Sequence, residues 1–337
     1  MEGLCETLGL DIIAHEKVRV REKTAKFGMG SGKAEELSSM ASEQGADLMV
    51  FDWNPSPSQQ RNWEALSGMP VLDRQELIIR IFAERASTRE AELQVKLAQL
   101  SYFLPRLTHK YIDLSRQRGG RYGTKGAGET KLETDRRKIE KRITQLEKEL
   151  EQVTKQRATQ RRQRQRTNMP VCAIVGYTNA GKSSLLNVLT GADVHAEDKL
   201  FVTLDAITRR FEPAPGVNVL LTDTVGFIRS LPHSLVKAFR STLEEAALAD
   251  ILIHILDASD PGIEANYQTT LSVLKELGAE NIPMITLFNK IDRLPLSNDD
   301  ETLEELLHRF PESIAISVKN GAGLDKVKAK IASMAEK

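Results

Sequence analysis

The chain has 337 residues, which is long enough for two or three domains that each bury a core. With 40% hydrophobic and 28% charged residues, its composition excludes collagen-like and disordered classes. No apolar run approaches the ~20 residues that span a bilayer, and the N-terminus lacks the basic and apolar regions of a secretory signal. Cys5 and Cys172 are isolated, which favours reduced thiols. We therefore expect a cytoplasmic protein, a monomer without membrane contact.

The net charge of zero hides an uneven distribution of charge along the chain. Residues 106–166 contain 19 Lys and Arg against 8 Asp and Glu, whereas the segments on either side are acidic. Such a basic block is typical of a contact with a polyanion, and nucleic acid is the leading candidate. The alternative is a solvated helix face.

Residues 1–73 have the pattern of a small α/β subdomain. Short apolar runs predict strands over 9–15, 46–52 and 69–73, and a helical pattern over 32–45 lies between the first two. The fragment GMGSGK at 28–33 is not a phosphate loop, because Phe27 and Ala34 stand where glycine and Ser or Thr are needed. It predicts a turn that begins a helix.

Residues 74–166 are expected to form an antiparallel helical hairpin. Helical patterning runs from Arg74 to Leu104, and a second helical run begins near Thr130. Leucine, isoleucine and valine recur at coiled-coil spacing in these runs, at Leu93, Leu97, Leu100 and Leu104, and at Ile139, Ile143, Leu146, Leu150 and Val153.

The predicted end of this hairpin, residues 116–137, is rich in glycine and basic residues, and we call it the glycine-rich loop. Glycine lets the backbone approach a surface closely, while cations neutralise phosphates and an aromatic ring stacks on an exposed base. We therefore predict that the loop binds RNA through Arg116, Arg118, Arg121, Tyr122 and Lys125.

A nucleotide site is predicted in residues 167–337, after Met169 and Pro170 break the helical pattern. GYTNAGKS at 176–183 matches the phosphate-loop pattern G-x-x-x-x-G-K-S and lies between a strand and a helix. Its backbone N–H groups are expected to cradle phosphates. Lys182 would reach the β- and γ-phosphates, and the Ser183 hydroxyl would ligate Mg²⁺.

The downstream motifs follow in the order that GTP hydrolysis requires. A strand ends at Asp223, which would hold Mg²⁺ through water, and the N–H of Gly226 would sense the γ-phosphate. Thr203 is the candidate switch threonine, which would close on the metal and the γ-phosphate. We expect Lys182, Thr203 and Gly226 to act in catalysis, and Ser183, Thr203 and Asp223 to hold the metal.

The segment NKID at 289–292 predicts guanine specificity. The Asp292 carboxylate would accept the N1–H and N2–H donors of guanine, whereas adenine has no N2 amine. Asn289 would meet the purine edge, and Lys290 would pack across the base. A loop at Ser317 would contact guanine O6.

Together these motifs predict a doubly wound, mostly parallel P-loop domain that binds GTP. The predicted nucleotide contacts are Gly176, Tyr177, Thr178, Asn179, Ala180, Gly181, Lys182, Ser183, Ser184, Phe201, Val202, Thr203, Leu204, Asp205, Asp223, Thr224, Val225, Gly226, Asn289, Lys290, Asp292, Ser317, Val318 and Lys319.

Phe227 follows Gly226, at the position where many small GTPases place a glutamine that orients the attacking water. A phenyl ring cannot do this, so we expect slow hydrolysis by the isolated protein. His254, between apolar neighbours on a strand, is expected in the core, and His233 has no metal-ligand partners at a recognisable spacing.

Over nearly its whole length the chain resembles the HflX family of ribosome-associated GTPases. The resemblance rests on GSGKAEEL (30–37), LAQLSYFLPRL (97–107), GAGETKLETDRR (126–137), GYTNAGKSSL (176–185), DTVGFIRSLPHSLVKAF (223–239) and NKID (289–292). It implies a GTPase that binds the large ribosomal subunit, with the N-terminal domain directed toward the peptidyl-transferase centre and roles in ribosome splitting, rescue or biogenesis.

The chain departs from the family pattern in a few places. It is expected to begin late in the N-terminal domain, without about one strand, and Ala206 and Val318 replace the usual proline and alanine. Two interpretations remain open. In one, a GTP cycle controls ribosome binding, and in the other an RNA-binding module uses nucleotide as a structural ligand.

Overall fold

The computed structural model describes residues 1–107, 127–165, 169–193, 200–201, 203–204, 206–227, 245–294 and 301–336. They form two compact units, one of residues 1–84 and 92–150 and the other of residues 85–91 and 151–337. Within the described residues no helix is long and apolar enough to cross a membrane. Both cysteines are buried and free, and burial raises the pKa of both thiols, that of Cys172 to about 12.

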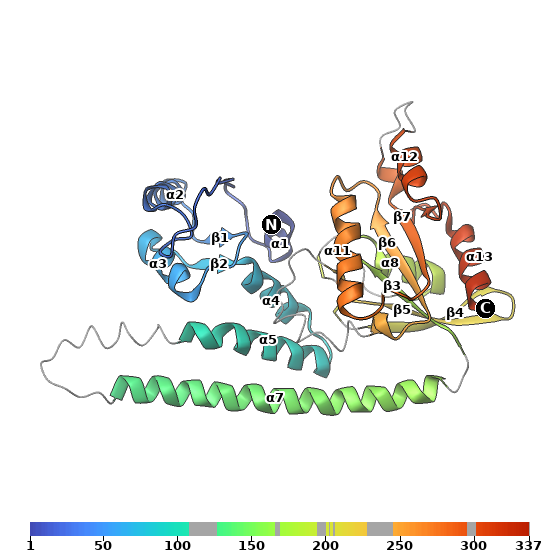
Figure 1. Ribbon diagram of the computed structural model, residues 1–337, viewed down its shortest axis with the longest axis horizontal. Coiled ribbons are helices and arrows are strands. Elements are labelled where there is room, and N and C mark those ends of the chain that lie inside the picture. Colours follow the sequence, from blue (N-terminus) through green and yellow to red (C-terminus); the bar gives the residue numbers. More distant parts are fainter. Residues whose placement is uncertain are drawn as a thin grey trace, which may run out of the picture. The chain divides into compact units, whose positions relative to one another are not determined.

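The first unit begins with a small α/β subdomain (Figure 1). Its two strands pair in parallel, and α2 and α3 pack against each other beside them. The bounds are α1 (Glu2–Thr7), α2 (Ser31–Glu43), β1 (Met49–Phe51), α3 (Pro57–Ser67) and β2 (Val71–Asp73).

Two of the three predicted strands in this subdomain are confirmed, at β1 and β2. The strand predicted over 9–15 is wrong, because this segment has no regular structure and its side chains Ile12 and Ile13 are 42% and 57% exposed. An apolar run forms a strand only where it finds a pairing partner and a face to cover. The predicted turn at 28–33 is confirmed: Gly28 has φ +75° and lies against the Trp53 ring, and α2 begins at Ser31.

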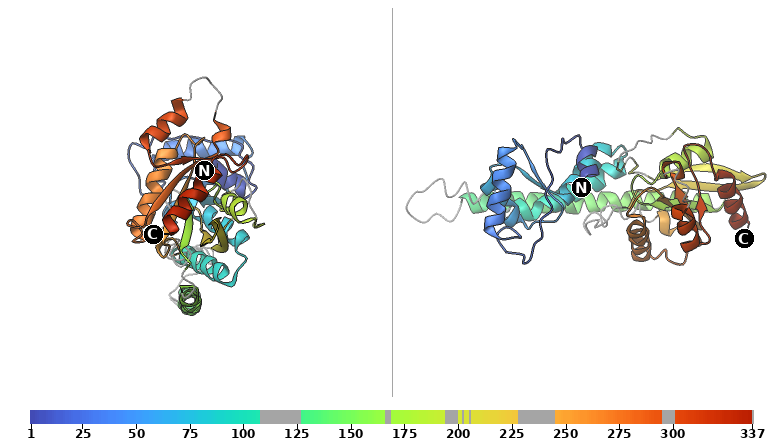
Figure 2. Two further views of the ribbon diagram at one scale, coloured as in Figure 1. Left: turned by 90° about the vertical axis from the view of Figure 1, so that its right-hand side faces the viewer. Right: turned by 90° about the horizontal axis from the view of Figure 1, so that it is seen from above.

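The helical pattern from Arg74 divides into α4 (Arg74–Arg85) and α5 (Arg89–Leu107). The division has a local cause, since the Thr88 hydroxyl accepts a hydrogen bond from the Ala91 N–H at 3.2 Å and caps the start of α5. The long α7 (Ala127–Gln165) follows and runs antiparallel beside α5 (Figures 1 and 2). The loop predicted over 116–137 is therefore wrong at its end, because residues 127–137 are helical. The predicted hairpin helices are therefore present, and the seam residues Leu93, Leu97 and Leu146 are buried.

A buried polar network joins the end of α5 to the small subdomain. The Asp73 carboxylate at the end of β2 accepts hydrogen bonds from Tyr102 Oη and Arg106 Nη2, each at 3.0 Å. The Arg106 guanidinium also lies 3.6 Å from the centre of the Tyr102 ring and donates to Gln60 Oε1 at 2.9 Å. This network fixes the last turn of α5, which directly precedes residue 108.

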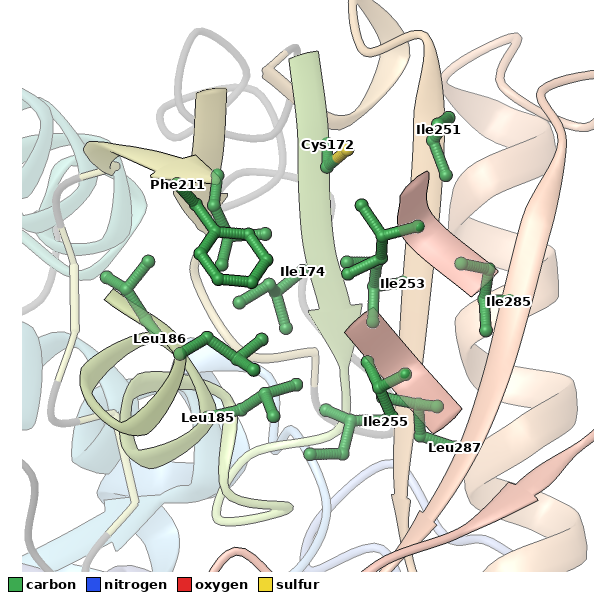
Figure 3. Close-up of a cluster of buried hydrophobic side chains, with 14 of the residues drawn as sticks. Cys172, Ile174, Leu185, Leu186, Phe211, Ile251, Ile253, Ile255, Ile285 and Leu287 are labelled. Carbon is green, nitrogen blue, oxygen red and sulfur yellow. The ribbon is translucent and has the colours of Figure 1, made fainter. Parts of the chain in front are cut away.

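The second unit contains a six-stranded sheet with the order β4-β5-β3-β6-β7-β8, in which only β4 runs antiparallel to its neighbour. Figure 3 shows branched side chains of β3 and β6 meeting Leu185 and Leu186 of α8 in its core. The elements are β3 (Val171–Gly176), α8 (Lys182–Thr190), β4 (Ile207–Ala214), β5 (Val217–Asp223), β6 (Ile251–Asp257), α11 (Ile263–Glu276), β7 (Met284–Asn289), η1 (Ile291–Arg293), α12 (Glu301–Arg309), β8 (Ile314–Ala315) and α13 (Leu324–Ala335).

This is the predicted doubly wound, mostly parallel P-loop architecture. The carboxyl ends of β3, β5, β6 and β7 lie along one edge of the sheet, where open α/β folds bind their ligands.

Candidate nucleotide-binding site

A cavity of about 470 Å³ opens at this edge of the sheet. Its lining combines the turn between β3 and α8 with the segments that follow β5 and β7. The lining residues are Thr178, Asn179, Gly181, Lys182, Ser183, Ser184, Asn187, Val188, Phe201, Thr203, Gly226, Asn289, Lys290, Asp292, Arg293, Val318 and Lys319. Segments more than 100 residues apart in the chain therefore meet at one place.

Backbone strain concentrates at this cavity. Among the described residues, the non-glycine residues with positive φ are Asn179 (+62°), Phe201 (+57°) and Lys290 (+65°), and all three line it. Such conformations cost of order 1–3 kcal/mol each and persist where the surrounding structure fixes them, commonly at ligand sites.

Glycine is required where the turn after β3 approaches other segments. A Cβ on Gly181, which has φ +100°, would lie 2.3 Å from Asn289 Nδ2. A Cβ on Gly226 would lie 2.8 Å from Thr178 Cγ2 and 2.9 Å from Lys182 Nζ. The close approach brings the D-x-x-G segment against the phosphate loop.

Three oxygen-bearing side chains converge beside Lys182. The Ser183 hydroxyl lies 2.6 Å from the Thr203 hydroxyl, and both donate to Asp223 Oδ2, at 2.5 and 3.0 Å. Asp223 is fully buried, and its other oxygen, Oδ1, has no hydrogen-bond partner among the described residues. An unpaired buried carboxylate oxygen costs free energy unless a ligand satisfies it.

Burial dominates the electrostatics of this group. It lowers the pKa of the Lys182 ammonium to about 8, a shift that Asp223 opposes and Lys290 reinforces. Burial also raises the pKa of the Asp223 carboxyl, against the opposing effect of Lys182 and the two hydroxyl donors. The Lys182 ammonium donates to the Tyr177 carbonyl at 2.8 Å. A cation held at a helix N-terminus in a dry site is suited to binding phosphate.

The NKID segment is tied to both neighbouring loops. Asn289 Nδ2 donates to the Ala180 carbonyl at 2.9 Å, while Asn289 Oδ1 accepts the Val318 N–H at 3.1 Å. The Ser317 hydroxyl donates to Asp292 Oδ1 at 2.6 Å, which lowers the pKa of that carboxyl. The Lys290 ammonium forms an ion pair of 2.8 Å with Asp257 Oδ2. The residues predicted to recognise the base are thus oriented by their neighbours.

Most of the predicted contact residues line the cavity, and some support it from behind. Ala180, Asp223 and Ser317 hold lining residues through the hydrogen bonds given above. Leu204, Thr224 and Val225 are buried, and Thr224 donates to the Ile174 carbonyl at 2.7 Å. Gly176 is the last residue of β3 and Tyr177 follows it, and neither lines the cavity. Val202 and Asp205 lie outside the described residues.

Sequence reasoning missed Asn187, Val188, Arg293 and Asp257. Asn187 and Val188 lie one helical turn beyond Ser183 and Ser184, so the spacing i, i+4 could have identified them. His254 is in the core as predicted, fully buried and stacked on Tyr267 with ring centroids 5.3 Å apart. Residue 233 and the five predicted RNA contacts, from Arg116 to Lys125, lie outside the described residues.

Family models match three consecutive parts of the chain. They are described as GTP-binding GTPase N-terminal over residues 1–83, GTP-binding GTPase Middle Region over 85–164, and 50S ribosome-binding GTPase over 171–290. The breaks between them fall near residues 84 and 165–170.

Curated relatives that match nearly the whole chain are also GTPases. GTPase HflX of Akkermansia muciniphila is 50% identical over 332 residues, covering 96% of this chain and 76% of the relative. GTPase HflX of Escherichia coli (strain K12) is 43% identical over 326 residues, covering 97% and 76%. A crystal structure of a GTP-binding protein from Sulfolobus solfataricus in complex with GDP matches with a TM-score of 0.50 and 26% identity, over 99% of this chain and 94% of that one. The chain belongs to the GTPase HflX family and is a GTP-binding GTPase.

Proposed function

We propose that this GTPase depends on Mg²⁺ and that its nucleotide state controls binding to the large ribosomal subunit. The observation that carries the metal assignment is the convergence of Ser183, Thr203 and Asp223, with Asp223 Oδ1 buried and unpaired among the described residues. Hydroxyl and carboxylate oxygens are the donors that Mg²⁺ prefers. When bound, the ion neutralises charge on the β- and γ-phosphates.

Different residues around the cavity would bind the phosphates and select the base. Lys182 would hold the β- and γ-phosphates at the N-terminus of α8, and the N–H of Gly226 would meet the γ-phosphate. Asp292 would select guanine, while Asn289 keeps the phosphate loop and the Val318 loop in register around the base.

The metal assignment is tested by comparing Asp223→Asn with wild type. The substitution keeps the shape of the side chain but removes its charge, so we expect a weaker apparent affinity for Mg²⁺ and restored hydrolysis at higher Mg²⁺ concentration. Hydrolysis that is unaffected by a chelator would contradict the assignment.

The ribosomal partner is supported by the basic segment 106–166 and by the similarity of residues 171–290 to a 50S ribosome-binding GTPase model. Ribosomal RNA is a polyanion of the kind that such a segment binds. In this proposal the glycine-rich loop contacts ribosomal RNA, and the hairpin of α5 and α7 carries it. The protein would work in the cytoplasm, as a monomer, in ribosome splitting, rescue or biogenesis.

We test the partner with a triple variant of the loop, Arg118→Ala, Arg121→Ala and Lys125→Ala. It should bind large subunits more weakly in a sedimentation assay, with a salt dependence reduced by roughly three phosphate contacts. GDP affinity should not change. The matched control removes three exposed lysines of the second unit, Lys275, Lys326 and Lys330. Equal ribosome binding by the loop variant and the control would overturn the RNA contact.

A further inference from the structure

GTP hydrolysis at this cavity needs a polar group that orients the attacking water, and Phe227 cannot supply it. The Phe227 ring is 1% exposed and does not line the cavity. Its backbone is fixed on both sides, because Phe227 N–H donates to the Gly176 carbonyl at 3.0 Å and the Phe227 carbonyl accepts the Thr178 N–H at 2.8 Å. The residue that follows D-x-x-G therefore acts as a backbone strap on the phosphate loop.

The same backbone hydrogen bond from Thr178 to Phe227 holds Thr178 in place, and nothing described so far explains why the Thr178 hydroxyl is buried without a partner among the described residues. Thr178 is 5% exposed and lines the cavity, yet its Oγ1 has no hydrogen-bond partner among the described residues. The other two hydroxyls beside Lys182, those of Ser183 and Thr203, are both paired. Buried hydroxyls are almost always hydrogen-bonded, so an orphaned one at a ligand site indicates a partner that arrives with the ligand.

Thr178 lies where the γ-phosphate is expected. Its Cγ2 and the Lys182 ammonium both lie within 3 Å of the position that a Cβ on Gly226 would take. Lys182 and Gly226 are the two groups assigned above to the γ-phosphate. The Thr178 side chain therefore lies beside Gly226 and the Lys182 ammonium.

We propose that the Thr178 hydroxyl orients the attacking water, the task that glutamine performs in many small GTPases. The water oxygen bonds to the γ-phosphorus, the bond from phosphorus to the β–γ bridging oxygen breaks, and GDP leaves with that electron pair. The water proton ends on a phosphate oxygen. The hydroxyl accepts a hydrogen bond from the water and donates one to the γ-phosphate, and it stays protonated throughout. Its contribution is orientation.

This inference rests on the proposed Mg²⁺-dependent hydrolysis and is tested with two variants of the full chain. Thr178→Val keeps the shape and removes the hydroxyl, whereas Thr178→Ser keeps the hydroxyl and removes the methyl group. Single-turnover hydrolysis of bound GTP is measured with and without large ribosomal subunits, alongside GDP affinity. Both variants should bind GDP like wild type, since the backbone N–H groups remain.

The valine variant should hydrolyse GTP ~100-fold more slowly than wild type, and the serine variant should stay within ~10-fold of it. Valine at the wild-type rate, or serine as slow as valine, would overturn the role of the hydroxyl. If the valine variant fails to bind GDP, the hydrolysis rate of the serine variant is compared with that of wild type, and a serine rate more than ~10-fold lower would overturn the role of the hydroxyl. If wild type itself needs no Mg²⁺ or shows no turnover, the proposed function fails instead, so the two failures are distinguishable.

Discussion

We propose that guanine recognition depends on Asp292. Its carboxylate is oriented by the Ser317 hydroxyl at 2.6 Å, which also lowers its pKa and keeps it charged as an acceptor for the N1–H and N2–H donors of guanine. In this proposal the neighbouring Lys290 and Asn289 would provide contacts that do not depend on those donors. Base selection would therefore depend on one side chain.

Asp292→Asn should move the preference from guanine toward xanthine, whose O2 acceptor suits an amide donor. We expect the ratio of GDP to XDP affinity to change by ~100-fold or more, because a site built for one hydrogen-bond pattern rejects the other. Equilibrium binding of both nucleotides measures the ratio. Asp325→Asn, at an exposed carboxylate of α13, is the control. An unchanged ratio for Asp292→Asn would contradict the assignment.

Asp257 should act on affinity without acting on selectivity. Its ion pair of 2.8 Å holds the Lys290 ammonium, and the Ser259 N–H and hydroxyl both donate to Asp257 Oδ1. Asp257→Asn frees a lysine that would pack across any purine. GDP and IDP affinities should therefore fall together, by about tenfold or 1.4 kcal/mol.

The matched control is Glu264→Gln, which removes an exposed ion pair of 3.5 Å on α11. It should leave both affinities unchanged. If Asp257→Asn alters GDP affinity and leaves IDP affinity intact, Lys290 does not act through the purine face.

At the scale of elements, the network of Asp73, Tyr102 and Arg106 connects β2 to the end of α5. Asp73 is fully buried, and the Arg106 side chain is 17% exposed. Removing one partner leaves a buried charge unpaired, so Arg106→Ala should destabilise the first unit by about 3 kcal/mol. Arg136→Ala, which removes an exposed ion pair on α7, should cost less than about 1 kcal/mol.

Both tryptophans, Trp53 and Trp63, belong to the first unit, so their fluorescence reports its unfolding separately. Urea unfolding of the two variants gives the comparison directly. Equal midpoints for Arg106→Ala and Arg136→Ala would show that the network does not stabilise the unit.

The sequence predicts an element well when residues close to it in the chain determine its structure, and poorly when distant residues do. The turn from β3 into α8 is determined by adjacent residues, so the motif GYTNAGKS predicts its place, whereas the cavity also needs segments more than 100 residues away in the chain. The strand over 9–15 could not, because Ile12 and Ile13 form a strand only if a pairing partner exists elsewhere in the fold. The ion pair of Asp257 with Lys290 connects the end of β6 to the residue that follows β7, and no sequence motif predicts it.

Phe227, which follows the D-x-x-G segment, also shows that the sequence does not predict contacts between distant residues. The sequence indicates that Phe227 cannot orient water, but only the structure shows that its carbonyl accepts a hydrogen bond from the Thr178 N–H. The hydroxyl that we propose in its place lies 49 positions earlier in the chain. Proximity of this kind follows from the parallel pairing of β3 and β5, whose ends meet at the site.

At the scale of the whole molecule, a basic central segment, residues 106–166, precedes a GTPase domain that lacks the usual glutamine. Alone, the protein should hydrolyse GTP at a rate near that of an unassisted small GTPase, roughly 10⁻⁴ to 10⁻³ s⁻¹. In the proposed function the ribosome would raise this rate by positioning residues 200–210 and 224–234 around the γ-phosphate, so the GTP form would bind tightly and the GDP form would dissociate.

The most direct test of this claim is the single-turnover rate of GTP hydrolysis under three conditions. The protein is measured alone, with saturating large ribosomal subunits, and with the same subunits after the triple substitution of Arg118, Arg121 and Lys125 by alanine. The account predicts slow, fast and slow hydrolysis, respectively. A fast rate for the isolated protein, or no stimulation by saturating subunits, would contradict it.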